Sequence, residues 1–253
     1  MSKLAIITGG SRGLGAAMVE KLGDMGFNVV LNYVSPSSEK LCDELIEKLR
    51  EKGVDGLAVQ GNVGEFEDCK KIVEAAVEKF GKKIDVLINN AGVTNNASFH
   101  EMDPADYTRL MNINLMSALH MCRNVLPYMV EANEGGLIIN MSSVGGLMGV
   151  AKQGDYCASK AGLIGLTRGL AMEYGPQKIR VNAICPGMIW TDMLRGVNQD
   201  EVQALKNYIP IGEIGEVEAI SSAMEFLINN DYMTGQFISP NGGLVIAISG
   251  QIA

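Results

Sequence analysis

Short apolar runs rich in β-branched residues recur along the chain, and most are separated by stretches in which apolar residues repeat with helical spacing. The runs are Leu4–Ile7, Val29–Leu31, Leu57–Val59, Val86–Ile88, Leu137–Ile139, Val181–Ile184 and Phe237–Ile238. Because short strands joined by helices form parallel sheets covered on both faces, the pattern predicts an α/β fold with a doubly wound parallel sheet of about seven strands.

The stretches with helical spacing predict the helices of this fold. The clearest are Glu39–Glu51, Glu65–Phe80, Ala105–Glu131 and Asp155–Glu173. The helical spacing of the last one is most regular over Gly162–Tyr174. From Trp190 to Gly212 the regularity lapses into a polar stretch with one short helical candidate, Gln199–Asn207. Since long irregular insertions in compact domains are often lids, we expect a substrate flap at about 190–212. No linker or repeat divides residues 1–253, which predicts a single domain.

Composition and charge exclude several classes of protein. The chain has 253 residues, of which 47% are hydrophobic and 20% charged, as in an ordinary soluble globular domain. Its net charge of -8 and the absence of any Lys/Arg run argue against nucleic acid or an anionic membrane as a partner. No segment offers about 18 consecutive apolar residues, and the start is too short for a signal peptide. We therefore expect a cytoplasmic protein.

The cysteines are odd in number and scattered without metal-type spacing. They are Cys42, Cys69, Cys122, Cys157 and Cys185. Reduced thiols in a cytosolic protein explain this distribution, and we expect no metal site.

A glycine-rich turn directly follows the first predicted strand and opens a helix. Its glycines are Gly9, Gly13 and Gly15, in the spacing Gly-x-x-x-Gly-x-Gly. Glycine permits the close approach of backbone to a pyrophosphate, and the helix N-terminus offers free N–H groups to it. The position predicts a Rossmann-type dinucleotide site. A purely structural turn is the alternative.

The end of the second predicted strand bears on the choice between NAD and NADP. An NAD site usually places an acid there to bind the ribose hydroxyls, whereas this chain has Asn32 and Tyr33. Arg12, inside the glycine turn, has the guanidinium geometry that suits a 2′-phosphate, although a solvated surface arginine is the alternative. We therefore expect NADP (NADPH) as the cofactor and regard NAD as less favoured.

Candidate chemistry comes from Tyr156 and Lys160, which lie on one face of a predicted helix, one turn apart. A nearby lysine cation favours the phenolate of a tyrosine and brings its pKa towards neutral pH, where the group exchanges protons. Ser142 and Ser143 follow the fifth predicted strand, and ligands of such sheets bind at the carboxyl ends of strands. By itself the pair is weak evidence, because a solvated lysine beside a half-buried tyrosine is common.

Several motifs in this order resemble those of the short-chain dehydrogenase/reductase family, and the match covers nearly the whole chain. They are Thr8-Gly9-x-x-x-Gly13-x-Gly15, Asn89-Asn90-Ala91-Gly92, Asn114, Ser143, Tyr156-x-x-x-Lys160 and Pro186-Gly187. The resemblance selects Ser143 over Ser142. It implies that Tyr156 protonates a carbonyl oxygen that Ser143 orients. It also implies that Lys160 binds the nicotinamide ribose and lowers the tyrosine pKa, and that Asn114 holds a water of the proton relay.

The resemblance also implies a set of cofactor-binding residues, to which Tyr156 and Lys160 belong. The others are Gly9, Ser11, Arg12, Gly13, Leu14, Gly15, Asn32, Tyr33, Asn62, Val63, Asn90, Ala91, Gly92, Pro186, Gly187, Ile189 and Thr191. Within this set, Ile189 and Thr191 are expected at the nicotinamide carboxamide. Asn62-Val63 stands where the family usually has Asp-Val at the adenine. The alternative for Asn89–Gly92 is a plain turn at a strand end.

Within the family, three segments look most like those of the 3-oxoacyl-acyl-carrier-protein reductases, which are tetramers that reduce a 3-oxoacyl thioester with NADPH. They are Ser143–Gly149, Ile209–Gly212 and Thr234–Gln236. The chain departs from these reductases at Glu213 and in an apolar tail after Gly243. A hydroxysteroid or other alicyclic alcohol dehydrogenase of the same family is the rival reading, and a non-catalytic dinucleotide-binding protein is a remote one.

The resemblance further implies a homotetramer, formed through the helices predicted from Ala105 to Glu131 and from Asp155 to Tyr174. Reductases that use carrier proteins tend to carry arginines before the serine strand and after the catalytic helix. This chain has Glu131 and Glu134 at the first place, and only Lys178 and Arg180 near the second. Since carrier proteins are acidic, we expect weak docking or none.

Overall fold

The computed structural model describes residues 2–191, 194, 202, 204 and 206–249. Seven parallel strands form one sheet in the order β3-β2-β1-β4-β5-β6-β7. They are β1 (Lys3–Ile7), β2 (Phe27–Tyr33), β3 (Gly56–Gln60), β4 (Val86–Asn89), β5 (Gly136–Met141), β6 (Ile179–Ile184) and β7 (Phe237–Ile238). The order reverses direction between β1 and β4, where a doubly wound sheet opens its ligand crevice. All seven predicted strands are confirmed.

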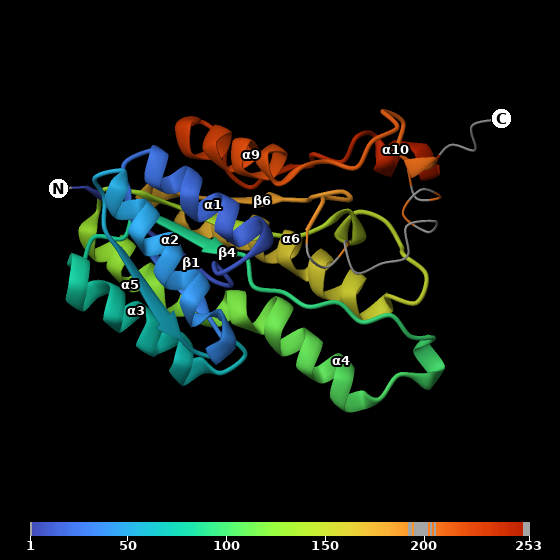
Figure 1. Ribbon diagram of the computed structural model, residues 1–253, viewed down its shortest axis with the longest axis horizontal. Helices are drawn as coiled ribbons and strands as arrows, with labels where there is room; N and C mark the ends of the chain where they lie inside the picture. Colours follow the sequence, from blue (N-terminus) through green and yellow to red (C-terminus); the bar gives the residue numbers. More distant parts are fainter. Residues whose placement is uncertain (1, 192–193, 195–201, 203, 205, 250–253) are drawn as a thin grey trace.

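Helices cover both faces of this sheet (Figure 1). The helices of the described residues are α1 (Gly13–Asp24), α2 (Glu39–Glu51), α3 (Phe66–Phe80), α4 (Pro104–Met111), α5 (Ser117–Ala132), α6 (Gly154–Tyr174), α9 (Val217–Asn229) and α10 (Leu244–Ser249), of which α4 and α10 lie beyond the sheet. The core on one face joins α1, α2 and α9, and the core on the other joins α3, α5 and α6. None of the described helices combines the length and apolarity needed to span a bilayer.

The central strands are apolar at most positions because both of their faces are buried. In β1, Ala5 and Ile7 belong to one core, and Leu4 and Ile6 belong to the other. Alternate side chains of a strand point to opposite faces, so a strand covered on both sides needs apolar residues throughout. This is why strand positions could be predicted from uninterrupted apolar runs.

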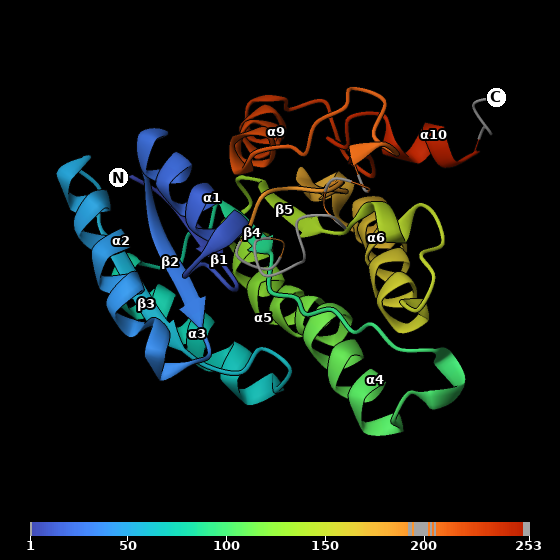
Figure 2. The ribbon, with the colours of Figure 1, turned by 45° about the vertical axis from the view of Figure 1, so that its right-hand side comes forward.

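The helix predicted at Ala105–Glu131 is interrupted. A π-helical turn at Asn112–Met116 separates α4 from α5, and α4 continues the line of α5 past the end of the sheet (Figures 1 and 2). Apolar periodicity continues through such a turn, so the sequence pattern did not reveal it. The helical candidate Gln199–Asn207 falls largely outside the described residues.

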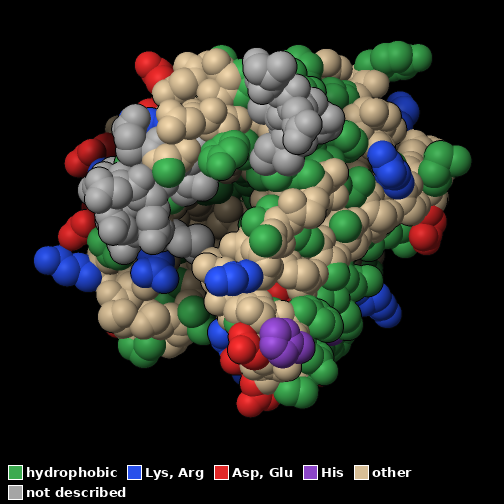
Figure 3. Space-filling model, turned by 90° about the vertical axis from the view of Figure 1, so that its right-hand side faces the viewer, with side chains coloured by type: hydrophobic (Ala, Val, Ile, Leu, Met, Phe, Trp, Pro, Cys, Tyr) green, Lys and Arg blue, Asp and Glu red, His purple; other side chains and the backbone are tan. Residues whose placement is uncertain are grey.

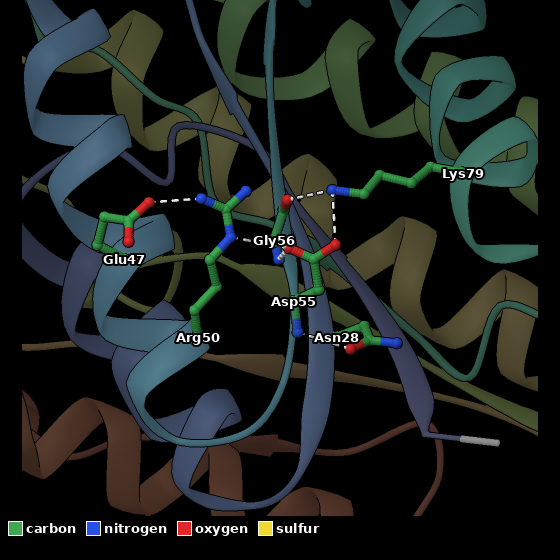
Figure 4. Close-up of polar contacts among 6 residues, drawn as sticks. All are labelled: Asn28, Glu47, Arg50, Asp55, Gly56 and Lys79. Atoms are coloured by element: carbon green, nitrogen blue, oxygen red, sulfur yellow. Dashed lines mark hydrogen bonds and ion pairs between the residues drawn. The ribbon is translucent and has the colours of Figure 1, made fainter.

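A polar network fastens α2 and α3 to β3 at the amino ends of the strands (Figure 4). The Asp55 carboxylate pairs with Lys79 at 2.8 Å and with Arg50 at 3.4 Å, and it accepts a hydrogen bond from the backbone N–H of Gly56. These contacts, led by the hydrogen bond from Lys79, lower the pKa of Asp55. The network lies at the opposite end of β3 from the ligand crevice, so it stabilises the scaffold and leaves the crevice open.

Candidate active site

Tyr156 and Lys160 lie on the first turns of α6, which begins at the carboxyl end of the sheet. Figure 3 views the molecule from this end, where its surface is hollowed. The Lys160 ammonium lies 5.7 Å from the centroid of the Tyr156 ring. Ser143 lies two residues after the end of β5, and its Oγ accepts a hydrogen bond from the backbone N–H of Gly145 at 3.1 Å. The structure therefore brings the predicted phenol, ammonium and hydroxyl to one end of the sheet.

The tyrosine pKa differs from the sequence-based expectation. Burial raises the pKa of the Tyr156 phenol above its usual value, and a hydrogen bond with Ser143 opposes this only in part. The expected lowering by Lys160 is wrong for the protein alone, because desolvation of the phenolate dominates. Gly145 packs closely against the ring, since an added Cβ there would lie 3.1 Å from a ring carbon of Tyr156.

Lys160 is buried, and its surroundings set the pKa of its ammonium group. Its Nζ donates a hydrogen bond to the carbonyl of Met141 at 2.8 Å, on the last residue of β5. Burial lowers the pKa of Lys160 to about 8. The ammonium is thus directed towards the strand end beside Ser143 and keeps its charge at neutral pH.

Asn114 lies in the π-helical turn, and its side chain is fully used in holding the site together. Its Oδ1 accepts a hydrogen bond from the backbone N–H of Val93, and its Nδ2 donates to the carbonyl of Val93 and to Ser159 Oγ. Ser159 Oγ in turn donates to the carbonyl of Tyr156 at 2.7 Å. The amide of Asn114 therefore joins the segment after β4 to α6, and its expected contact with a water of the proton relay stays a prediction.

The glycine turn fits a pyrophosphate. Gly9 and Gly13 have positive φ angles of 63° and 55°, which favour glycine. At Gly15 an added Cβ would lie 2.2 Å from the carbonyl oxygen of Gly9, so a side chain is excluded. Arg12, in extended conformation, precedes α1 without capping it and is exposed, as a phosphate-binding guanidinium needs to be. Next to these glycines, Ser11 is half-buried and Leu14 packs on the first core.

Asn32 and Tyr33 lie at the cofactor end of β2, but their side chains serve the fold. Asn32 is buried, donates from Nδ2 to the carbonyls of Val59 and Gly61, and accepts at Oδ1 from the N–H of Gly9. Tyr33 is buried in the core that contains α1 and α2. The Asn32 amide therefore holds the glycine turn in place, and a contact of Asn32 with the cofactor stays a prediction.

The segment after β4 supports the same turn. Asn90 donates from Nδ2 to the carbonyls of Thr8 and Gly9, and the backbone N–H of Asn90 and of Ala91 both donate to Thr8 Oγ1. An added Cβ at Gly92 would lie 3.3 Å from Lys160 Nζ. Asn90, Ala91 and Gly92 thus connect the pyrophosphate turn to the catalytic lysine, as expected of residues along a cofactor.

Asn62 and Val63 follow β3 and have different environments. The Oδ1 of Asn62 accepts a hydrogen bond from the N–H of Gly64, and the residue lines a groove that also reaches Val93 and Ile113. Val63 is buried in the core on the α3 side. Only Asn62 therefore presents its side chain to the predicted adenine side.

The segment after β6 approaches the catalytic serine and the glycine turn. The backbone N–H of Val144, next to Ser143, donates to the carbonyl of Pro186 at 3.0 Å. At Gly187 an added Cβ would lie 2.6 Å from Asn241 Cα, so the close approach of the two backbones requires glycine. Ile189 is buried, and Thr191 lies beside Gly13. The predicted nicotinamide segment thus lies between catalytic and phosphate-binding residues.

Two residues of the site were not predicted. Both carry buried hydroxyl groups. The hydroxyl of Thr8 binds the turn after β4, and the hydroxyl of Ser159 binds the Asn114 amide. Ser159 precedes Lys160 on α6, and a buried polar residue inside an apolar helix face was the signal that could have identified it. Across the described residues, no three His, Cys, Asp or Glu side chains gather as a metal site would require.

The charged residues considered for carrier docking lie away from this site. Glu131 pairs with Lys82 at 3.2 Å, and Glu134 pairs with Lys83, at the amino end of β5. Arg180 donates to the carbonyl of Leu227 at 2.8 Å and is largely buried. Arg180 therefore offers little surface charge to a carrier, because its guanidinium binds the carbonyls at the end of α9.

Comparison with known proteins agrees with this geometry. The family model described as short chain dehydrogenase matches residues 3–202. The 3-oxoacyl-[acyl-carrier-protein] reductase FabG of Staphylococcus epidermidis is 35% identical over 246 residues, which cover 96% of this chain and 99% of that protein.

Two solved structures are similar over nearly their whole length. Levodione reductase has a TM-score of 0.90 at 29% identity and covers 97% of this chain and 98% of its own. A blue fluorescent protein from a metagenomic library, in complex with NADPH, has a TM-score of 0.88 at 34% identity and covers 96% of this chain and 97% of its own. Together with the seven-stranded sheet, these matches show that the chain belongs to the short-chain dehydrogenase/reductase family and is an NAD(P)-dependent oxidoreductase.

Proposed function

We propose that this enzyme transfers hydride reversibly between NADPH and a carbonyl compound, and that its physiological substrate is a 3-oxoacyl thioester. The observation that carries the proposal is the placement of Ser143, Tyr156 and Lys160 at the carboxyl end of the sheet, beside a glycine turn that fits a pyrophosphate. The relatives named as 3-oxoacyl-[acyl-carrier-protein] reductases favour the acyl thioester.

The bound nicotinamide supplies or accepts the hydride, and the side chains of the protein manage the proton. Tyr156 is the proton donor in reduction, because its raised pKa keeps the phenol protonated at neutral pH. Ser143 donates its hydroxyl hydrogen to the same carbonyl oxygen and orients it. The Lys160 cation, close to the tyrosine ring, favours the phenolate left after proton transfer. Asn114 positions Tyr156 and Lys160, because its amide donates hydrogen bonds to Ser159, which lies between them on α6, and to the carbonyl of Val93.

The preference for NADP rests on two features of the cofactor end. Arg12 is exposed on the glycine turn, and the position after Asn32 carries no acid that would repel a 2′-phosphate. The neighbouring structure in complex with NADPH supports the same choice. Equal kcat/KM for NADH and NADPH would contradict it.

The substrate lies, in this proposal, between Ser143 and the flap at 190–212. A small apolar cluster joins Val144 to Ile209, Ile214 and Leu244, with Trp190 packed against it. Such walls suit the apolar part of a substrate. They also fit an alicyclic ketone, and the similarity to levodione reductase keeps that second substrate class open.

One experiment separates the two substrate classes. The purified enzyme is offered acetoacetyl thioesters, cyclic ketones and hydroxysteroids, each with NADPH or NADP⁺ and with NADH or NAD⁺. We expect the highest kcat/KM for the acetoacetyl thioester with NADPH. A cyclic ketone or steroid turned over at least tenfold more efficiently would overturn the thioester assignment and leave the catalytic residues in place.

We further propose a cytoplasmic homotetramer. All five cysteines are free thiols, which suits a reducing compartment. Large apolar side chains are exposed on the helices predicted to form subunit contacts. They are Tyr107 on α4, Met116 in the π-helical turn, Leu119 and Val130 on α5, and Met172 on α6. Apolar patches of this kind are usually covered by a partner subunit.

A further inference from the structure

A groove of about 710 Å³ opens where α4 faces the carboxyl ends of β2, β3 and β4. Val34 follows β2, Asn62 follows β3 and Val93 follows β4, and each lines this groove. From the opposite side, α4 and the π-helical turn contribute Arg109 and Ile113. The groove is therefore built from the half of the sheet that, in a doubly wound fold, receives the adenosine half of a dinucleotide.

The walls of the groove have the chemistry of a site for a planar base. Val34, Val93 and Ile113 are apolar, and Val34 is 64% exposed although it is a large hydrophobic residue. Asn62 brings an amide whose Oδ1 is engaged by Gly64, while its Nδ2 has no partner among the described residues. Apolar faces with one free edge donor match a nucleobase, which has two apolar faces and a polar rim.

Arg109 brings a positive charge to this groove. It lies on α4, one turn before Ile113 of the π-helical turn, and both residues line the groove. Within the described part of the chain, its guanidinium has no ion pair and no hydrogen bond, and Glu65 is the other charged residue of the lining. Most arginines that serve stability have a carboxylate or carbonyl partner, as Arg50 and Arg180 do here. Arg109 is instead free to meet a ligand.

We propose that Arg109 is a cofactor-binding residue that contacts the adenine base of the nicotinamide dinucleotide. The inference rests on the proposed function. The order of groups along the cofactor indicates which group each arginine meets. The pyrophosphate lies at the glycine turn, the ribose with its 2′-position follows, and the base is furthest away. Arg12, on the turn, is at the level of the 2′-phosphate, whereas Arg109, on α4, is at the level of the base. Guanidinium planes stack on aromatic rings such as adenine.

The two arginines therefore make different predictions for the two cofactors. NADH and NADPH share the adenine and differ only at the 2′-position, so Arg109→Ala weakens both by the same factor. A cation–π contact at an exposed site corresponds to about a twofold to fivefold increase in Kd. Arg12→Ala weakens NADPH and leaves NADH nearly unchanged.

The experiment measures Kd for NADPH, NADH and 5′-AMP by calorimetry and fluorescence, without any substrate. Wild type is compared with Arg109→Ala, with Arg109→Lys and with Arg123→Ala, which removes an exposed arginine of α5 outside the groove. Thermal melts without ligand show that each variant is folded. We expect weaker binding of all three ligands in Arg109→Ala, partial recovery in Arg109→Lys, and no change in Arg123→Ala.

Two results would overturn the assignment of Arg109. Unchanged affinities in Arg109→Ala would show that the guanidinium does not touch the cofactor, and a loss confined to NADPH would show that it meets the 2′-phosphate and not the base. Failure of the NADP proposal is seen separately, as equal affinity of the wild type for NADPH and NADH together with no effect of Arg12→Ala.

Discussion

At the scale of single residues, the hydroxyl of Tyr156 is the group on which turnover depends in the proposed mechanism. Its environment is apolar enough to raise the pKa, and Ser143 provides the hydrogen bond that opposes this shift. A phenol that stays protonated at neutral pH is suited to donate a proton to a carbonyl oxygen in reduction.

We expect Tyr156→Phe to lose at least about 99% of kcat, since proton donation of this kind contributes about 10²–10⁴-fold. Folding and cofactor affinity should remain nearly unchanged, because only one oxygen is removed. Steady-state kinetics, circular dichroism and cofactor titration measure the three properties. A variant that keeps more than about a tenth of the wild-type kcat would contradict the assignment.

Lys160→Ala is the matched comparison for this variant. It removes a buried cation that faces both the tyrosine ring and the region beside Gly92. We therefore expect loss of turnover together with weaker cofactor binding, whereas Tyr156→Phe affects turnover alone. If the cofactor Kd of Lys160→Ala equals that of the wild type, the predicted contact of Lys160 with the nicotinamide ribose is wrong.

At the scale of elements, the molecule separates a rigid amino end from a functional carboxyl end. At the amino end, Asp55 and its partners hold α2, β3 and α3 together. At the carboxyl end, the π-helical turn presents Asn114. Extra residues in a helical turn redirect side chains, and π-helical turns are frequent at functional sites. Here the turn directs the Asn114 amide towards Val93 and Ser159.

The Asp55 network predicts a pH dependence of stability. Its folded-state pKa is lowered, so the carboxylate stabilises the fold above the ordinary aspartate pKa, and this contribution is lost as the pH falls through the lowered value. Asp55 is partly exposed, so we expect Asp55→Asn to cost at most about 1 kcal/mol at neutral pH. Urea unfolding at pH 7 and at about pH 3.5 should show the difference from wild type shrinking at the lower pH.

Glu78→Gln is the control for this measurement. Glu78 is exposed on α3 and has no ion pair among the described residues. Its replacement should leave the free energy of unfolding unchanged at both pH values. An Asp55→Asn variant as stable as wild type at pH 7 would show that the ion pairs with Lys79 and Arg50 contribute nothing measurable.

At the scale of the whole molecule, assembly and partner choice follow from the surface. The apolar residues exposed on α5 and at its start include Met116, Leu119 and Val130. We expect a tetramer in light scattering at micromolar concentration, and Leu119→Glu should shift the mass towards smaller species by placing a charge in a buried contact. A wild-type monomer would contradict the proposed assembly.

Charge governs the last prediction, which concerns acyl carrier protein. The chain carries a net charge of -8, Glu131 and Glu134 are at the amino end of β5, and Arg180 is buried against α9. Two acidic proteins repel each other, so we expect kcat/KM for an acetoacetyl group on the carrier to be no higher than for the same group on coenzyme A. The comparison is made at low and high salt. A carrier preference that fades with salt would reveal a basic docking site and contradict this prediction.

The amino-acid sequence by itself determined the strands and the glycine turn, and it predicts Ser143, Tyr156 and Lys160 as the catalytic residues. Continuous apolar runs mark strands buried on both faces, and glycines at Gly9, Gly13 and Gly15 are required by backbone geometry that any chain with this turn shares. Local patterns of this kind depend on neighbours in sequence, which is why they could be predicted.

Only the tertiary structure decided which side chains remain available for ligands. Asn32 lies at the predicted cofactor position, yet hydrogen bonds to Val59, Gly61 and Gly9 occupy it, and Arg180 is engaged by the end of α9. The tyrosine pKa likewise depends on burial, and a sequence does not state which groups exclude water from a phenol. Hydrogen-bond partners and desolvation are set by segments distant along the chain, so they follow from the folded arrangement alone.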